Sequence, residues 1–185
     1  MRIITGRARG VRLETLDGEA TRPTSERMKE AVFSAIQFRI AGRRVLDLFA
    51  GSGQMGLEAL SRGAESCMFV DVSREAMDIV KKNAQKTRLG DACHYLVSDY
   101  RTYIGKAGKT FDLVFIDPPY AMKAAGDALR RITEKKLLNK EAIVILESDE
   151  EQPFGILPCG FRLDKAARYG FSYIHILTYT GEENI

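Results

Sequence analysis

Four consecutive residues in the middle of the chain have types and an order that could do chemistry. Asp117-Pro118-Pro119-Tyr120 follows the apolar run 113–116, which indicates a buried strand. Because each proline lacks an N–H donor and fixes φ, the turn is stiff and the Pro118 carbonyl is left as an acceptor. The Asp117 carboxylate and the Pro118 carbonyl together offer two acceptors to one exocyclic NH₂ group. A nucleobase can stack on the ring of Tyr120. The tetrad therefore predicts catalysis on an amino nitrogen of a nucleobase; a plain strand-terminating turn is the alternative.

A glycine-rich loop earlier in the chain predicts a nucleoside-binding site. Gly51-Ser52-Gly53-Gln54-Met55-Gly56 matches G-x-G-x-x-G between a predicted strand and a predicted helix, and Asp71 follows Gly51 by twenty residues. This spacing is typical of dinucleotide sites, in which the acid binds a ribose. Asp47 favours S-adenosylmethionine (SAM) over NAD, because a carboxylate at the base of the loop suits an amino group and not a pyrophosphate. The alternative role for Asp47 is to hold the loop through backbone N–H groups.

The residues expected to bind the cofactor lie in this loop or at the ends of predicted strands. Ligands bind at that edge in open α/β sheets. Asp99 follows the third predicted strand, where it could accept a hydrogen bond from an adenine amino group. The set comprises Asp47, Phe49, Ala50, Gly51, Ser52, Gly53, Gly56, Asp71, Val72, Asp99 and Tyr100.

From residue 45 onward, short apolar runs alternate with helix-like stretches. That alternation predicts a doubly wound α/β fold with a mostly parallel sheet and helices on both faces. A terminal hairpin with its turn at Tyr169-Gly170 adds one antiparallel strand, which gives seven strands. The predicted strands are 45–49, 67–71, 94–97, 113–116, 142–146, 161–167 and 172–180, and the predicted helices are 55–61, 74–86 and 124–138.

Residues 1–44 do not follow this alternation and predict a small β-hairpin and a helix over 26–38. We expect them to form a basic N-terminal extension to a SAM-binding catalytic domain over 45–185. They hold ten Arg/Lys against five Asp/Glu, whereas the whole chain has a net charge of +3. Such an asymmetry is typical of a polyanion partner, although a solvated surface hairpin is the alternative. The candidate RNA-binding residues are Arg2, Arg7, Arg9, Arg12 and Arg27.

Other features exclude whole classes of protein. The three cysteines are odd in number and widely spaced, which argues against a disulfide framework or a zinc site. No apolar run approaches the roughly 18 residues of a membrane span, and the N-terminus is too polar for a signal peptide. We therefore expect a cytoplasmic protein, monomeric and without a metal. The acidic run 147–151 is expected to be a solvated loop.

Together, the tetrad and the loop 47–53 resemble the Rossmann-fold (class I) amino methyltransferases. More narrowly, the chain resembles the RsmD-type methyltransferases, which methylate the N2 amino group of a guanine in small-subunit (16S) ribosomal RNA. This resemblance runs nearly end to end, and Arg22-Pro23-Thr24-Ser25-Glu26-Arg27 is the part that separates the family from other Asp-Pro-Pro-Tyr enzymes. Two departures are Asp71, where the family often has Glu, and Ser25-Glu26 in the helix cap.

The resemblance implies a fold, a cofactor and a substrate. SAM would be the methyl donor, with Arg22, Pro23 and Thr24 over it, and Asp117 to Tyr120 would hold the target guanine. The substrate would be ribosomal RNA, free or within a small-subunit assembly particle. Two alternatives are an amino methyltransferase for adenine N6 or a protein glutamine, and a non-catalytic RNA-binding assembly factor.

Overall fold

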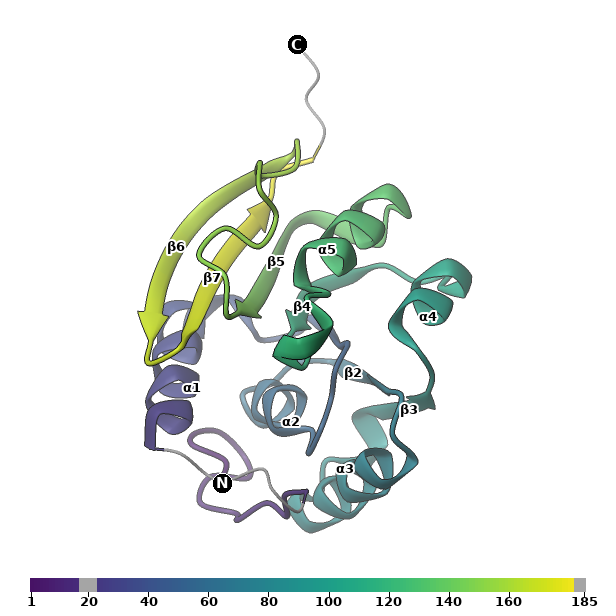
Figure 1. Cartoon of the computed structure of the whole chain (residues 1–185). Coiled ribbons are helices and arrows are strands. Elements are labelled where there is room, and N and C mark those ends of the chain that lie inside the picture. Colours follow the sequence, from purple (N-terminus) through teal and green to yellow (C-terminus); the bar gives the residue numbers. More distant parts are fainter. Residues whose placement is uncertain (17–22, 182–185) are drawn as a thin grey trace.

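A computed structural model describes residues 1–16 and 23–181, which include one sheet of seven strands. The spatial order is β3-β2-β1-β4-β5-β7-β6 (Figure 1), and β7 alone runs in the direction opposite to the other six strands. The predicted fold class is therefore confirmed. The strands are β1 (Arg44–Asp47), β2 (Ser66–Asp71), β3 (Cys93–Val97), β4 (Phe111–Ile116), β5 (Leu138–Ser148), β6 (Phe161–Tyr169) and β7 (Ser172–Tyr179).

Helices cover both faces of the sheet because successive strand residues point to opposite sides. In β4, Leu113 and Phe115 belong to one hydrophobic cluster, and Val114 and Ile116 belong to the other. The first cluster includes α1 (Pro23–Ala35), α2 (Gln54–Ser61) and α3 (Arg74–Thr87); the second includes α4 (Tyr100–Lys106) and α5 (Ala125–Glu134). Within the described ranges, every helix is too short or too polar to cross a membrane.

The parallel register places the ends of several strands at one edge of the sheet. Asp47, the last residue of β1, pairs with Phe69 in β2 and with Phe115 in β4. The chain winds from β1 to β3 in one direction and then returns to β4 on the other side of β1. The topological switch point therefore lies between β1 and β4, where ligands bind in folds of this class.

Several elements differ from the predicted ones. Helix α1 ends at Ala35 and is followed by the 3₁₀ turn η1 (Gln37–Arg39). Helix α5 ends at Glu134 because the chain enters the left-handed region at Lys136, with φ of 55°, and Leu138 already pairs with Phe111. Helix α4 was not predicted, and Asp99 caps it.

The N-terminal arm, residues 1–13, folds back on itself and packs against the helices. Its hairpin contains one isolated bridge, between Arg2 and Arg12, in place of the paired strands that the sequence predicts. Gly6 has φ of +90°, and a Cβ there would lie 1.9 Å from the Ser61 carbonyl oxygen. Ile3 is fully buried in the same hydrophobic cluster as the first face of the sheet. The division at residue 44 stays a prediction, and the two parts share this core.

A buried carboxylate joins the arm to α1 and α2. Glu58 is fully buried in α2, and its Oε2 lies 3.1 Å from the ammonium group of Lys29 in α1, which is 1% exposed. The same carboxylate accepts hydrogen bonds from the backbone N–H groups of Ile4, at 2.8 Å, and Thr5, at 3.1 Å. Arg62 donates to Oε1 at 2.8 Å. Burial lowers the pKa of Lys29, and its contact with Glu58 opposes that shift.

We expect Glu58→Ala to lower the free energy of unfolding by about 3–5 kcal/mol. The substitution would leave the Lys29 ammonium group buried without its carboxylate partner. Glu65→Ala is the matched control, because Glu65 is exposed on the neighbouring turn and should change stability by less than about 0.5 kcal/mol. Urea unfolding of the three proteins measures both effects, and equal midpoints for Glu58→Ala and the wild type would contradict this role.

Candidate active site

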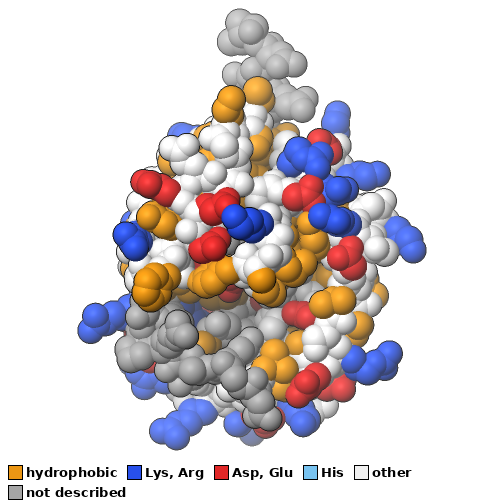
Figure 2. All heavy atoms as spheres, viewed as in Figure 1, with side chains coloured by type: hydrophobic (Ala, Val, Ile, Leu, Met, Phe, Trp, Pro, Cys, Tyr) orange, Lys and Arg blue, Asp and Glu red, His pale blue; other side chains and the backbone are white. Residues whose placement is uncertain are grey.

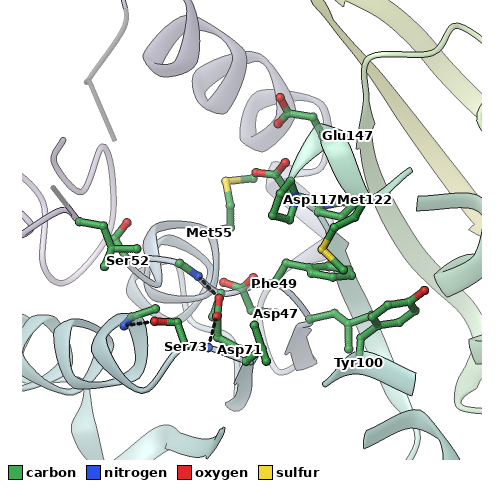
Figure 3. A pocket seen from close by; sticks show the side chains of 18 of the residues that line it. Asp47, Phe49, Ser52, Met55, Asp71, Ser73, Tyr100, Asp117, Met122 and Glu147 are labelled. Carbon is green, nitrogen blue, oxygen red and sulfur yellow. Dashed lines mark hydrogen bonds between the residues drawn. The ribbon is translucent and has the colours of Figure 1, made fainter. Parts of the chain in front are cut away.

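A cavity of about 770 Å³ opens at the carboxyl edge of the sheet, above β1 and β4 (Figure 3). This volume is suitable for a nucleoside-sized ligand. Most of the predicted cofactor residues line it together with the whole tetrad: Asp47, Phe49, Ala50, Gly51, Ser52, Asp71, Val72, Asp99, Tyr100, Asp117, Pro118, Pro119 and Tyr120.

Two of the remaining predicted cofactor residues are described in full, and neither of them lines the cavity. Gly53 and Gly56 lie behind it and shape the loop. Pro23 and Thr24 form the start of α1, and Arg22 lies outside the described residues. Sequence reasoning missed several lining residues on other segments: Leu16, Leu48, Gln54, Met55, Ser73, Ala76, Ser98, Met122 and Glu147.

The glycine loop needs its glycines for both conformation and space. Gly51 and Gly53 have φ of 52° and 77°, in the left-handed region that favours glycine. A Cβ on Gly56 would lie 2.4 Å from the Phe69 ring and 2.6 Å from the Cys67 sulfur. Helix α2 therefore packs directly on β2, and the loop stays close to the cavity.

Asp47 holds the glycine loop, one of the two roles considered from the sequence, and it also lines the cavity. Its side chain is 4% exposed at the base of the loop, and Oδ2 accepts a hydrogen bond from the Gly56 N–H at 3.0 Å. Burial raises the pKa of Asp47 to about 7, against the opposing effect of that hydrogen bond, and the nearby Asp71 adds to the rise. A cationic group in the cavity would stabilise the ionised form.

Asp71 and Asp99 hold backbone as well as lining the cavity. Asp71 accepts from the Gly51 N–H at 2.9 Å and from the Ser73 N–H at 2.8 Å, so it fixes the loop and the start of α3. One oxygen of Asp99 accepts from the N–H groups of Arg101 and Thr102 and caps α4. The sequence had suggested only ligand contacts for these two acids.

The tetrad closes one side of the cavity, where Figure 3 shows Asp117 near Glu147. Tyr120 is 41% exposed, and its hydroxyl donates to Glu147 Oε1 at 2.9 Å and contacts the Ser172 hydroxyl. Burial is the largest of the effects that raise the pKa of Tyr120 to about 12, so the phenol is neutral near pH 7. Its ring is held as a neutral, half-exposed face beside Asp117.

Glu147 corrects the expectation of a solvated loop. It belongs to β5, is 9% exposed and faces the cavity. The sequence placed the end of the strand one residue too early to reveal this. Alternation along β5 could not have shown it, because Ile145 and Leu146, on opposite faces of the strand, are both buried.

Asn83 was also missed as a functional residue. Its side chain is fully buried in α3 and donates to the carbonyl oxygens of Glu14 and Ser52, each at 2.9 Å. Its Oδ1 accepts from the Glu14 N–H at 2.8 Å. Asn83 thereby ties the end of the arm to the glycine loop, next to Leu16 in the cavity wall.

All five arginines predicted to bind RNA are exposed. None of the ion pairs formed between described residues involves them. Figure 2 shows Lys and Arg side chains distributed around this face of the molecule, the lower part near the arm included. Arg2, Arg7, Arg9, Arg12 and Arg27 therefore keep charge available for a polyanion.

Comparisons with known proteins agree with the fold and the site. Residues 1–178 match the family model described as "Conserved hypothetical protein 95". The chain is 38% identical over 154 residues to "Putative rRNA methyltransferase YlbH" of Bacillus subtilis, a match that covers 82% of this chain and 84% of that protein. It is 33% identical over 156 residues to "Ribosomal RNA small subunit methyltransferase D" of Haemophilus influenzae, covering 83% and 81%.

A solved structure gives the same result in three dimensions. The structure described as "Putative methyltransferase yhhF from Escherichia coli" superposes with a TM-score of 0.88 and 27% identity, covering 98% of this chain and 99% of that one. The predicted methyltransferase fold is thereby confirmed. The chain belongs to the family that the model describes, the RsmD-type methyltransferases, as its motifs predicted.

Proposed function

We propose that this protein transfers a methyl group from SAM to the exocyclic N2 of a guanine in small-subunit ribosomal RNA. One observation carries the proposal: an acid-lined cavity of nucleoside size opens directly onto the Asp-Pro-Pro-Tyr tetrad. The names of the relatives support ribosomal RNA as the substrate class. The proposal includes a monomeric, cytoplasmic enzyme that acts on free RNA or on a small-subunit assembly particle.

The charge of the cavity fits SAM. Five carboxylates line it, and the described lining contains no Lys, Arg or His. SAM carries a sulfonium and an ammonium group, which these acids attract, whereas the pyrophosphate of NAD would be repelled. Phe49 and Tyr100, with ring centroids 5.2 Å apart, provide an aromatic wall for the adenine. Bound SAM supplies the electrophilic methyl group.

The tetrad supplies the other half of the reaction. A guanine N2 is a poor nucleophile, because its lone pair is delocalised into the ring. Hydrogen bonds from its two N–H groups to the Asp117 carboxylate and the Pro118 carbonyl would orient that lone pair toward the cavity and stabilise the positive charge that develops on nitrogen. Tyr120 would stack on the base, held by its hydrogen bond to Glu147. The guanine must be unpaired or flipped out of a duplex to reach this site.

The affinity for SAM should depend on pH through Asp47. Its raised pKa of about 7 means that the acid is protonated below that pH in the free protein, and only the ionised form attracts the ammonium group. We expect the dissociation constant to rise as pH falls below 7, by up to about tenfold per unit, and to level off above it. Calorimetric titration with SAM between pH 5.5 and 7.8 measures this.

Asp47→Asn is the control for that titration. It keeps an oxygen to accept from the Gly56 N–H but has no charge to titrate, so its binding should be weak and independent of pH. NAD should not bind to either protein. A wild-type affinity that does not change with pH would contradict the role of Asp47.

Asp117→Ala should slow methyl transfer by about 10²–10³-fold, the usual effect of losing one preorganised electrostatic partner. Affinities for SAM and RNA should change little, because Asp47, Asp71 and Asp99 still line the cofactor side and RNA is held mainly through phosphates. Single-turnover transfer from labelled SAM gives the rate, and parallel titrations give the affinities. Near wild-type transfer would refute this reading of the tetrad.

Replacing Arg2, Arg7, Arg9 and Arg12 with Gln should weaken RNA binding and reduce its salt dependence, while SAM binding is unchanged. The salt slope is the slope of the logarithm of the RNA-binding constant against the logarithm of the salt concentration. Each lost phosphate contact reduces its magnitude by about 0.7–0.9, so four lost contacts would reduce it by about 3. Substitution is preferable to deletion, because the arm buries Ile3 and donates to Glu58.

Four exposed lysines provide the control with the same charge change. Lys106, Lys109, Lys135 and Lys140 lie where α4 and α5 end and where β4 and β5 begin, at the edge opposite the cavity. Their replacement with Gln should leave most of the salt slope in place. Equal losses in the two quadruple variants would mean that the arm contributes only general charge.

A further inference from the structure

The turn between β6 and β7 presents an aromatic ring to solvent beside the active site. Phe171 is 81% exposed. A single exposed apolar residue is ordinary in a soluble protein, so exposure alone indicates nothing. Phe171 differs from an ordinary exposed apolar residue in its position near the cavity and in the exposed apolar residues around that cavity. Figure 2 shows hydrophobic side chains gathered in a belt across the middle of this face, and exposed aromatic and apolar residues near the cavity include Tyr120 and Met122.

The topology places this turn at the edge of the cavity. Because β7 is antiparallel, it begins at the edge where β4 and β5 end. Tyr173 pairs with Ser148, the last residue of β5, so the turn extends beyond the end of that strand. The hydroxyl of Ser172, the residue after Phe171, contacts the hydroxyl of Tyr120. Phe171 is therefore one residue away from a direct contact with the tetrad.

The turn is fixed and carries a positive charge. Gly170 has φ of 62°, and the Arg168 side chain donates to its carbonyl oxygen at 2.9 Å. The guanidinium of Arg168 lies 5.5 Å from the centroid of the Tyr173 ring. Tyr169 packs against the hydrophobic core, which anchors the other side of the turn. An exposed ring on a rigid base, next to an arginine, is the combination that binds single-stranded nucleic acid.

We propose that Phe171 stacks on an unpaired base of the substrate RNA that flanks the target guanine, while Arg168 faces the adjacent phosphate. The inference rests on the proposed function and adds to it a second stacking platform, separate from Tyr120. Phe171 would stack on the flanking base and Tyr120 on the target guanine, which would separate the two bases. Only the target guanine would then reach Asp117. An apolar surface of a ribosomal protein is the competing occupant, and the experiment distinguishes it.

Phe171→Ala should raise the RNA concentration that gives half-maximal single-turnover transfer by about 5- to 100-fold, the range expected for one lost base stack. The rate at saturating RNA and the affinity for SAM should stay within about twofold of the wild type. Phe38→Ala is the matched control, because Phe38 is 94% exposed on η1, which precedes β1 at the opposite edge of the sheet. The substrate is whichever the wild type methylates, ribosomal RNA transcript or small-subunit particles.

Two further variants separate base stacking from apolar contact. Phe171→Trp keeps an aromatic face and should retain wild-type half-saturation, whereas Phe171→Leu keeps only apolar bulk and should behave like Phe171→Ala. Equal half-saturation for Phe171→Ala and Phe38→Ala would overturn the inference, and so would full rescue by Leu, which would indicate an apolar protein surface. Absence of transfer to RNA by the wild type would refute the proposed function and the inference with it. Transfer by the wild type that Phe171→Ala leaves unchanged would refute the inference alone.

Discussion

The gathering of five carboxylates around one cavity at the edge of the sheet is the constraint to which the rest of the site is fitted. Parallel register brings Asp47 and Asp71 to the ends of adjacent strands, and Asp117 follows the next one. Backbone N–H groups offset part of the cost, since Asp71 accepts from Gly51 and Ser73. The pKa of Asp47 is raised mainly by its burial, and the nearby Asp71 adds to that rise. The sulfonium and ammonium groups of SAM would be attracted to these acids, so the arrangement favours SAM over ligands whose groups here are negatively charged.

The second constraint holds the N-terminal arm next to the glycine loop. Glu58 in α2 accepts hydrogen bonds from the backbone N–H groups of Ile4 and Thr5 in the arm. Asn83 in α3 forms hydrogen bonds with the backbone of Glu14, at the end of the arm. Both helices begin directly after segments that line the cavity. A buried ion pair adds little net stability compared with a well-packed apolar core, but leaving one partner unpaired is costly. These contacts hold the arm, and with it the backbone that carries its arginines, against α2 and α3.

The sequence predicted correctly those features that depend on a short, continuous stretch of residues. The glycine loop, the tetrad and the alternation of strands and helices each occupy a short stretch, and all lie where the sequence placed them. Contacts between distant segments were not accessible in this way. Glu147 reaches the cavity only because β5 continues to Ser148, and Asn83 acts only because the arm folds onto α3. The boundary between α5 and β5 was misplaced because a left-handed residue, Lys136, breaks a pattern that otherwise suits a helix.

Different strands line the two sides of the cavity. The residues that we propose to bind the cofactor follow β1, β2 and β3, whereas the proposed wall for the target base comes from the ends of β4 and β5 and from the β6–β7 turn. Tyr120 joins the two strands of that wall, because its hydroxyl bonds Glu147 on β5 and contacts Ser172 on β7. The antiparallel β7 is what makes this possible, since a parallel strand would begin at the far edge and carry no turn to the site. The one departure from parallel order therefore places residues of the C-terminal hairpin beside the tetrad, where we propose that the target base binds.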